Sequence, residues 1–137
     1  MTAAALLSAV LARLRADAVL AADLGGRIWD CAPRDVVFPH LVVEEISSRD
    51  RSGVDARLDE HRLALRVLSR VGGRREALTL LARVEALLVP DDPVADGLAL
   101  DGARVVLLRR EAADVRLQRD RLTAEATLRL IALVEPD

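Results

Sequence analysis

The side chains that carry out most protein chemistry are few in this sequence and lie far apart. Cys31 is the only cysteine, and His40 and His61 are the only histidines. A cysteine and a histidine can act as nucleophile and base, but no flanking motif marks a nucleophile here, and nothing in the spacing brings the three together. Two imidazoles without HxH or HxxxH spacing also make a poor metal site. We therefore expect no catalytic residue, no metal and no cofactor.

Two further motifs have a chemical interpretation. The letters GGRR, which end in Arg74 and Arg75, precede an apolar helical pattern. Backbone amides at a helix start, together with guanidinium groups, can bind phosphate. A strand-to-helix turn with solvated arginines explains the same residues, and we favour it. Glu44 and Glu45 are adjacent in a strand-like segment, so their side chains point to opposite faces and make a poor acid–base pair.

The composition excludes several function classes. The chain has 20 basic and 22 acidic residues and a formal net charge of −2, and every basic residue is arginine. Without lysine there is no P-loop lysine, no Schiff-base lysine and no Ser/Lys dyad. A balanced charge also lacks the positive field that non-specific phosphate binding needs, which disfavours a nucleic-acid function. One cysteine allows no intramolecular disulfide and fits synthesis in a reducing cytoplasm.

The apolar N-terminal segment predicts a helix rather than an export signal. Arg13, Arg15 and Asp17 interrupt its apolar part, whereas a signal peptide has an early basic region and an unbroken apolar stretch. Apolar residues recur there at spacings of three and four, which is typical of one helix face; they are Leu7, Val10, Leu11, Leu14 and Ala18. No apolar run approaches the roughly 20 residues that span a bilayer. We expect a soluble protein.

Periodicity along the chain predicts an α+β fold with a mostly antiparallel sheet of about four to five strands and two helices packed on one face. The first helix is expected to be capped by Thr2 and to stop at Gly25-Gly26. The second is expected to run from Ala77 to Leu88 before Pro90 and Pro93, with one apolar stripe of Ala77, Leu80, Leu81, Val84, Leu87 and Leu88. The expected strands are 27–30, 40–48, 58–70, 98–100 with 105–108 across an Asp101-Gly102 turn, and 122–134. In the last strand, one face is expected to be apolar: Ala124, Ala126, Leu128, Leu130, Ala132 and Val134.

Two irregular segments accompany these strands. Residues 47–57 have neither period and contain Gly53, so we expect a long hairpin tip or mobile loop that is available for a partner contact. Charged residues, among them Arg109, Arg110 and Asp114, interrupt the alternation that follows residue 105. They predict a bulge or a strand that leaves the sheet.

The order of the sequence blocks resembles the phage tail-completion, or tail-terminator, family of long-tailed phages and gene-transfer-agent clusters. The resemblance covers nearly the whole chain. It rests on LGGRIWDCAP, FPHLVVEE, HRLALRVLSRVGGRREAL and LDGARVVLLRREAAD, followed by a strand that ends in ALVE. The chain departs from the family near Asp120 to Thr123, where a turn containing glycine is expected.

This resemblance implies one structural domain, residues 1–137, that forms a ring, expected to be a hexamer, at the head-proximal end of the tail tube. Such a ring ends tube polymerisation and joins the tail to the head connector. The implied partners are further copies of the chain, the tail-tube protein and the head-closure or connector protein. DNA would pass through the lumen without specific binding, and no membrane is involved. The implied location is the neck of a virion or phage-like particle.

Two charged groups are the candidate protein interfaces. They are Arg49, Asp50 and Arg51 in the polar segment, and Arg70, Arg74 and Arg75 beside the second helix. Arginine and carboxylate side chains make oriented, bidentate contacts. Closed cyclic symmetry repeats one such interface around a ring.

Two other functions stay open at this stage. The nearer one is another neck ring, a connector adaptor or head-closure protein, which contacts the portal side instead of the tube. The more distant one is a small cytosolic enzyme or ligand-binding domain with a pocket between the second helix and the sheet. Neighbouring genes distinguish them, because capsid, portal and tube genes favour assembly and metabolic genes favour an enzyme.

Overall fold

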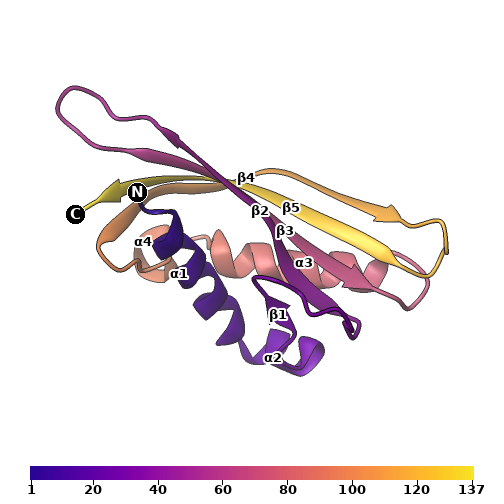
Figure 1. The fold of residues 1–137 in the computed structure, drawn as a ribbon. Helices are drawn as coiled ribbons and strands as arrows, with labels where there is room; N and C mark the ends of the chain where they lie inside the picture. Colours follow the sequence, from indigo (N-terminus) through magenta and orange to yellow (C-terminus); the bar gives the residue numbers. More distant parts are fainter.

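A five-stranded sheet organises the chain in the computed structural model, which describes residues 1–137 (Figure 1). The order across the sheet is β1-β2-β3-β5-β4, and only β1 and β2 are parallel. The expected α+β class with a mostly antiparallel sheet is confirmed. The strands are β1 (Ile28–Trp29), β2 (His40–Asp50), β3 (Asp59–Ser69), β4 (Ala103–Leu117) and β5 (Ala124–Pro136).

All helices lie on one side of the sheet (Figure 1). They are α1 (Ala3–Arg15), α2 (Ala18–Leu24), α3 (Arg75–Leu88) and α4 (Pro93–Asp96). Their number differs from the expected two, because the first predicted helix is split and Pro93 begins a one-turn helix. Proline suits a first helical turn, since its missing N–H has no partner there in any case. No helix is long and apolar enough to cross a membrane.

Asp17 causes the break between α1 and α2. Its carboxylate accepts a hydrogen bond from the backbone N–H of Leu20 at 3.0 Å and so caps α2. The same carboxylate accepts two hydrogen bonds from Arg83 of α3, at 3.0 and 2.5 Å. These bonds with Arg83 hold the pKa of Asp17 below its usual value. A side chain that caps a new helix and binds a distant helix outweighs the propensity of the alanine-rich segment to continue.

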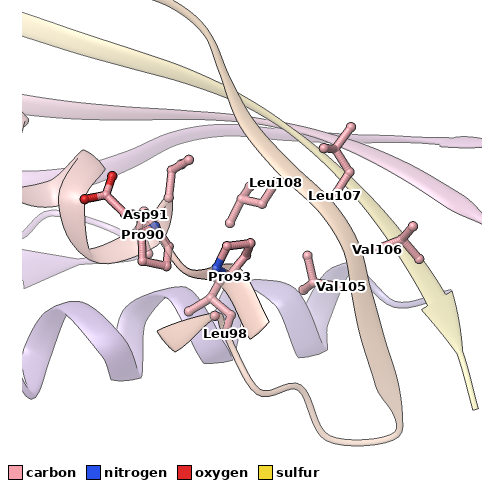
Figure 2. A pocket seen from close by; sticks show the side chains of 11 residues that line it. Pro90, Asp91, Pro93, Leu98, Val105, Val106, Leu107 and Leu108 are labelled. Carbon is pink, nitrogen blue, oxygen red and sulfur yellow. The ribbon is translucent and has the colours of Figure 1, made fainter. Parts of the chain in front are cut away.

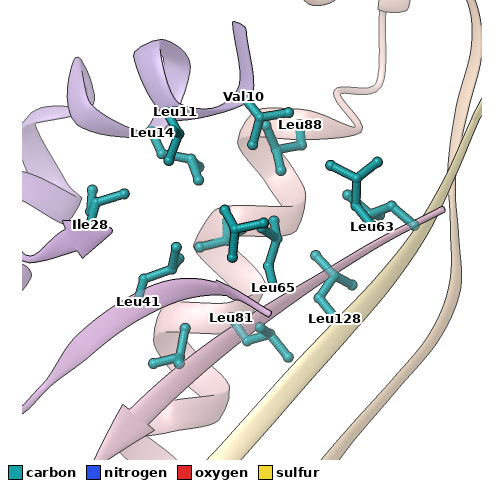
Figure 3. Packing of buried hydrophobic residues seen from close by; sticks show 14 of the residues in the cluster. Val10, Leu11, Leu14, Ile28, Leu41, Leu63, Leu65, Leu81, Leu88 and Leu128 are labelled. Carbon is teal, nitrogen blue, oxygen red and sulfur yellow. The ribbon is translucent and has the colours of Figure 1, made fainter. Parts of the chain in front are cut away.

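The core lies between the helices and one face of β3 and β5. The face of β5 that was expected to be apolar is buried, as are the corresponding residues of β3 (Figure 3). On β5 they are Ala124, Ala126, Leu128, Leu130, Ala132 and Val134, and on β3 they are His61, Leu63, Leu65 and Val67. Helix α3 packs on them with five of the six residues of its predicted stripe, Ala77, Leu80, Leu81, Val84 and Leu88, and the sixth, Leu87, is only half-buried. Each large apolar side chain contributes about 1.5–3 kcal/mol of burial.

His61 is the polar member of this face and ties the N-terminus to the sheet. It is fully buried, and its Nε2 and Nδ1 each lie 2.7 Å from a hydroxyl oxygen, of Thr2 and Ser48 respectively. The hydroxyl and backbone N–H of Thr2 also donate to Asp59, at 2.9 and 3.0 Å. Thr2 precedes α1 as expected, but its side chain makes no capping hydrogen bond.

Both chain termini lie at the end of the sheet where the β2–β3 hairpin begins (Figure 1). The N-terminus is fixed there by the contact between Thr2 and Asp59. The C-terminal residue Asp137 donates its backbone N–H to the carbonyl of Gly102 at 3.0 Å.

Strand β4 is longer and less regular than the sequence indicates. The expected bulge is present between Arg110 and Ala112, and a second register shift lies between Val105 and Leu107. Asp101-Gly102 forms the expected turn, but the predicted strand before it is wrong. Leu100 makes only an isolated bridge to Ala103. The segment before the turn instead contains α4, which Asp92 caps through the N–H groups of residues 94 and 95.

The turn between β4 and β5 replaces the expected glycine with Arg121, whose φ is +59°. Left-handed backbone costs a side chain roughly 1 kcal/mol relative to glycine. Asp120 offsets this cost by accepting the N–H groups of Leu122 and Thr123, both at 2.9 Å. A side-chain-capped turn therefore does what a glycine was expected to do.

The second face of the sheet carries ion pairs instead of helices. Five of its arginines pair with carboxylates. They are Arg62, Arg66, Arg104, Arg116 and Arg129. Their stems cover small and apolar residues beneath them, since Ala64, Thr127 and Ile131 on this face are all buried.

Replacing Asp17 tests its two roles. We expect Asp17→Ala to lower the free energy of unfolding by about 1 kcal/mol, because α2 loses its cap. Asp17→Asn retains a capping oxygen and loses the charge opposite Arg83, so its loss should be smaller. Urea denaturation followed by circular dichroism measures both variants. Equal losses for the two would contradict a capping role.

Acid should destabilise the fold through its histidines. Burial lowers the pKa of both His40 and His61 below the ordinary value of 6.5. The unfolded chain therefore takes up protons first as the pH falls, and stability declines from about pH 6.5 downward. We expect the free energy of unfolding to fall between pH 7 and 5.5, where carboxylates hardly titrate. The double variant His40→Gln/His61→Gln should be less stable at pH 7, but its free energy of unfolding should not fall between pH 7 and 5.5. If the free energy of the variant falls with pH as steeply as that of the native chain, the histidines are not the cause.

Candidate functional site

The six candidate interface residues lie at two opposite ends of the sheet. Arg49 and Asp50 are the last residues of β2, and Arg51 begins the loop that follows. The other three, Arg70, Arg74 and Arg75, lie where β3 ends and α3 begins. The structure thus keeps each sequence group together and separates the two groups by the length of the strands (Figure 1).

The first group belongs to a hairpin arm, which we define as residues 49–59: the end of β2, the connecting loop and the first residue of β3. The arm extends beyond the rest of the sheet (Figure 1). It is internally bonded: the N–H of Arg51 donates to Leu58 at 2.8 Å, and that of Gly53 donates to Ala56 at 2.9 Å. Ser52 donates its N–H to Asp50 at 2.8 Å, and hydrogen bonds from Ser52 lower the pKa of this carboxyl. Val54 is fully exposed at the tip.

The second group forms a basic end together with the β4–β5 turn. Arg70 donates to the hydroxyl of Thr123 at 3.1 Å, and its guanidinium lies 4.2 Å from the centre of the Phe38 ring. Gly72 donates its N–H to the carbonyl of Leu122 at 3.3 Å, which joins the two turns. Arg74 and Arg75 are exposed. These contacts hold the guanidinium of Arg70 in place, whereas the guanidinium groups of Arg74 and Arg75 are solvated.

An apolar groove lies at the edge of the sheet, between the end of α3 and the start of β4 (Figure 2). Its cavity volume is about 340 Å³. It is lined by residues of the 88–98 segment and by Val105, Val106, Leu107 and Leu108, and Asp91 is its only charged residue. A small-molecule site normally has several convergent polar groups. The groove lies where the ligand-binding alternative expected a pocket, and its chemistry suits an apolar side chain better.

Strand β4 and most of β2 are edges of the sheet. β4 pairs only with β5, and β1 pairs with β2 only at Leu41 and Val42. The outer backbone groups of the remaining strand lengths have no strand partner. Such edges are templates for pairing with another chain.

Cys31, His40 and His61 have separate surroundings. Cys31 is exposed. His40 is buried with its Nδ1 3.2 Å from the carbonyl of Val37, while His61 lies between Thr2 and Ser48. No hydrogen bond joins any two of the three, and no group of three potential metal ligands is present.

Comparison with known proteins decides the family. The family model described as tail completion protein gp17 matches residues 8–135. The chain belongs to this tail completion family. A solved structure described as the virion of a native gene transfer agent (GTA) particle contains a chain that is 29% identical to it, with a TM-score of 0.85. That match covers 98% of this chain and 97% of the other. No curated protein sequence matches.

Membership in the tail completion family confirms the resemblance that the sequence blocks indicate. It makes the chain a structural protein of the tail or neck of a phage-type virion. The ligand-binding alternative places a pocket near this groove, but the sequence does not predict the two open sheet edges. Those edges depend on the lengths and directions of the strands, and the sequence predicts Val105 to Leu108 only as strand residues.

Proposed function

We propose that the chain forms a ring, expected to be a hexamer, at the head-proximal end of the tail tube, where it ends tube polymerisation and joins the tail to the head connector. The family match over residues 8–135 carries this proposal. The similarity to a chain of a gene-transfer-agent virion supports a place in an assembled particle of that kind.

The shape and charge of the molecule fit such a role. A ring needs two different surfaces on each copy, because every copy contacts one neighbour on each side. It also needs surfaces at the two ends of its axis for the tube and the connector. The hairpin arm and the basic end lie at opposite ends of the sheet (Figure 1). The face with the ion-paired arginines is close to neutral, which suits a lumen that lets DNA pass without binding it.

Disruption of the gene tests the proposal directly. Particles from the disrupted strain should be filled heads without tails, accompanied by free tails of irregular length, and a complemented strain should make normal particles. Electron microscopy distinguishes the outcomes. Intact tailed particles from the disrupted strain would remove the proposed function, and uniform tails with open connectors would favour another neck ring.

Charge reversal at the basic end tests a contact surface. We expect Arg74→Glu/Arg75→Glu to reduce head–tail joining at least about tenfold, as the loss of paired charges at one interface commonly does. The fold should be unaffected, because both side chains are exposed and form no ion pair. Counts of tailed particles measure the effect, and Arg34→Glu, at another exposed arginine, is the control. A normal yield would exclude this end from the contact.

A further inference from the structure

The two edges of the sheet have directions that suit pairing between copies. β2, β3, β5 and β4 are successively antiparallel, so β4 and β2 run in opposite directions. When copies are related by rotation in a ring, β4 of one copy beside β2 of the next would continue the sheet as an antiparallel pair. β1 leaves this possible, because it covers only Leu41 and Val42 of β2.

The hairpin arm and the groove lie at the same level of the sheet, on opposite edges. Asp50 pairs with Asp59, Asp59 with Val134, and Val134 with Val105. These four residues form one rung across the sheet. Val105 is also a wall of the groove, so the arm begins at the rung where the groove lies. Val54 lies four residues beyond Asp50. A neighbouring copy whose β2 edge is shifted along β4 by about the length of the arm therefore brings the arm tip to the groove.

The side chains at these two places are complementary. Val54 is fully exposed at the tip of the arm, and the half-buried side chains of Val105 and Leu108 point into the groove (Figure 2). Burying an exposed valine in an apolar groove removes both surfaces from water. The edges also differ in charge. β2 carries three acidic residues and one arginine, while β4 carries four arginines and two acidic residues. Opposite charges favour this pairing and disfavour pairing of like edges.

We propose that successive copies of the chain join through these surfaces: the β4 edge and apolar groove of one copy receive the β2 edge and hairpin arm of the next, with Val54 in the groove. The proposal rests on the proposed ring and names the contact that closes it. The contact is heterologous, as a ring requires, and one copy alone cannot satisfy it because its own arm lies on the far edge of the sheet.

Site-specific cross-linking in particles tests the proposal. In a Cys31→Ser background, Val54→Cys is combined with Val105→Cys, whose side chain points into the groove, and purified particles are treated with a short bismaleimide. We expect a ladder of covalent multimers on a denaturing gel. Either cysteine alone should give no ladder. The control pair Val19→Cys with Val105→Cys uses an exposed valine of α2 and should also give none. Tailed particles without a ladder of multimers would overturn the proposed contact between copies, but they would not contradict the proposed ring.

A second variant covers the case in which the cysteines impair assembly. Val54→Asp should reduce the yield of tailed particles at least about tenfold, since a charge replaces the same apolar contact at every interface. Circular dichroism should show an unchanged fold, because Val54 contacts water alone. Val19→Asp, near the start of α2 where an acid is favourable, should give a normal yield. A normal yield with Val54→Asp would refute the contact, whereas the gene disruption tests the ring function separately.

Discussion

The packing of α3 on the helix-facing side of β3 and β5 is the constraint from which the other features follow. These two central strands present a face to the helix that is apolar apart from His61, with large residues such as Leu65 and Leu128 beside small ones such as Ala126. The small residues let the helix approach the sheet closely, so the core fits between one sheet and one layer of helices. Only one face of the sheet is buried against helices. The opposite face can therefore carry its layer of arginine and carboxylate pairs.

One layer of helices also explains where contacts with other molecules are available. Helices cover one face, ion pairs cover the other, and the strands extend to the edges without a cover. An isolated protein with a 15-residue edge strand risks uncontrolled pairing. Here the bulge at Arg110 and Ala112 and the charges along β4 restrict what can pair with it. A structural protein of a virion needs such a balance, because it must assemble with chosen partners and with nothing else.

The sequence predicted the α+β class, the apolar faces of α3 and β5, and the bulge in β4, because each depends on residues close together in the chain. It failed where a distant residue decides the local structure. The residues near Asp17 do not indicate that it binds Arg83, which is 66 residues away in the sequence. This contact helps to end α1. Leu98 to Leu100 look like a strand, but Leu98 lines the groove and Leu100 makes only an isolated bridge to Ala103. The arginines of the candidate interfaces were grouped correctly along the chain, yet their separation to opposite ends depends on the strand lengths.

The position of the termini has a practical consequence for studying assembly. The N-terminus is bound to Asp59 and the C-terminus to Gly102, so both lie beside the hairpin arm and the turn that leads into β4. An affinity tag or fluorescent protein fused to either end would add bulk at that same end of the sheet. The opposite end holds neither terminus (Figure 1). A small label in the exposed segment between β1 and β2, at Arg34 or Asp35, would keep both termini native and leave the arm clear.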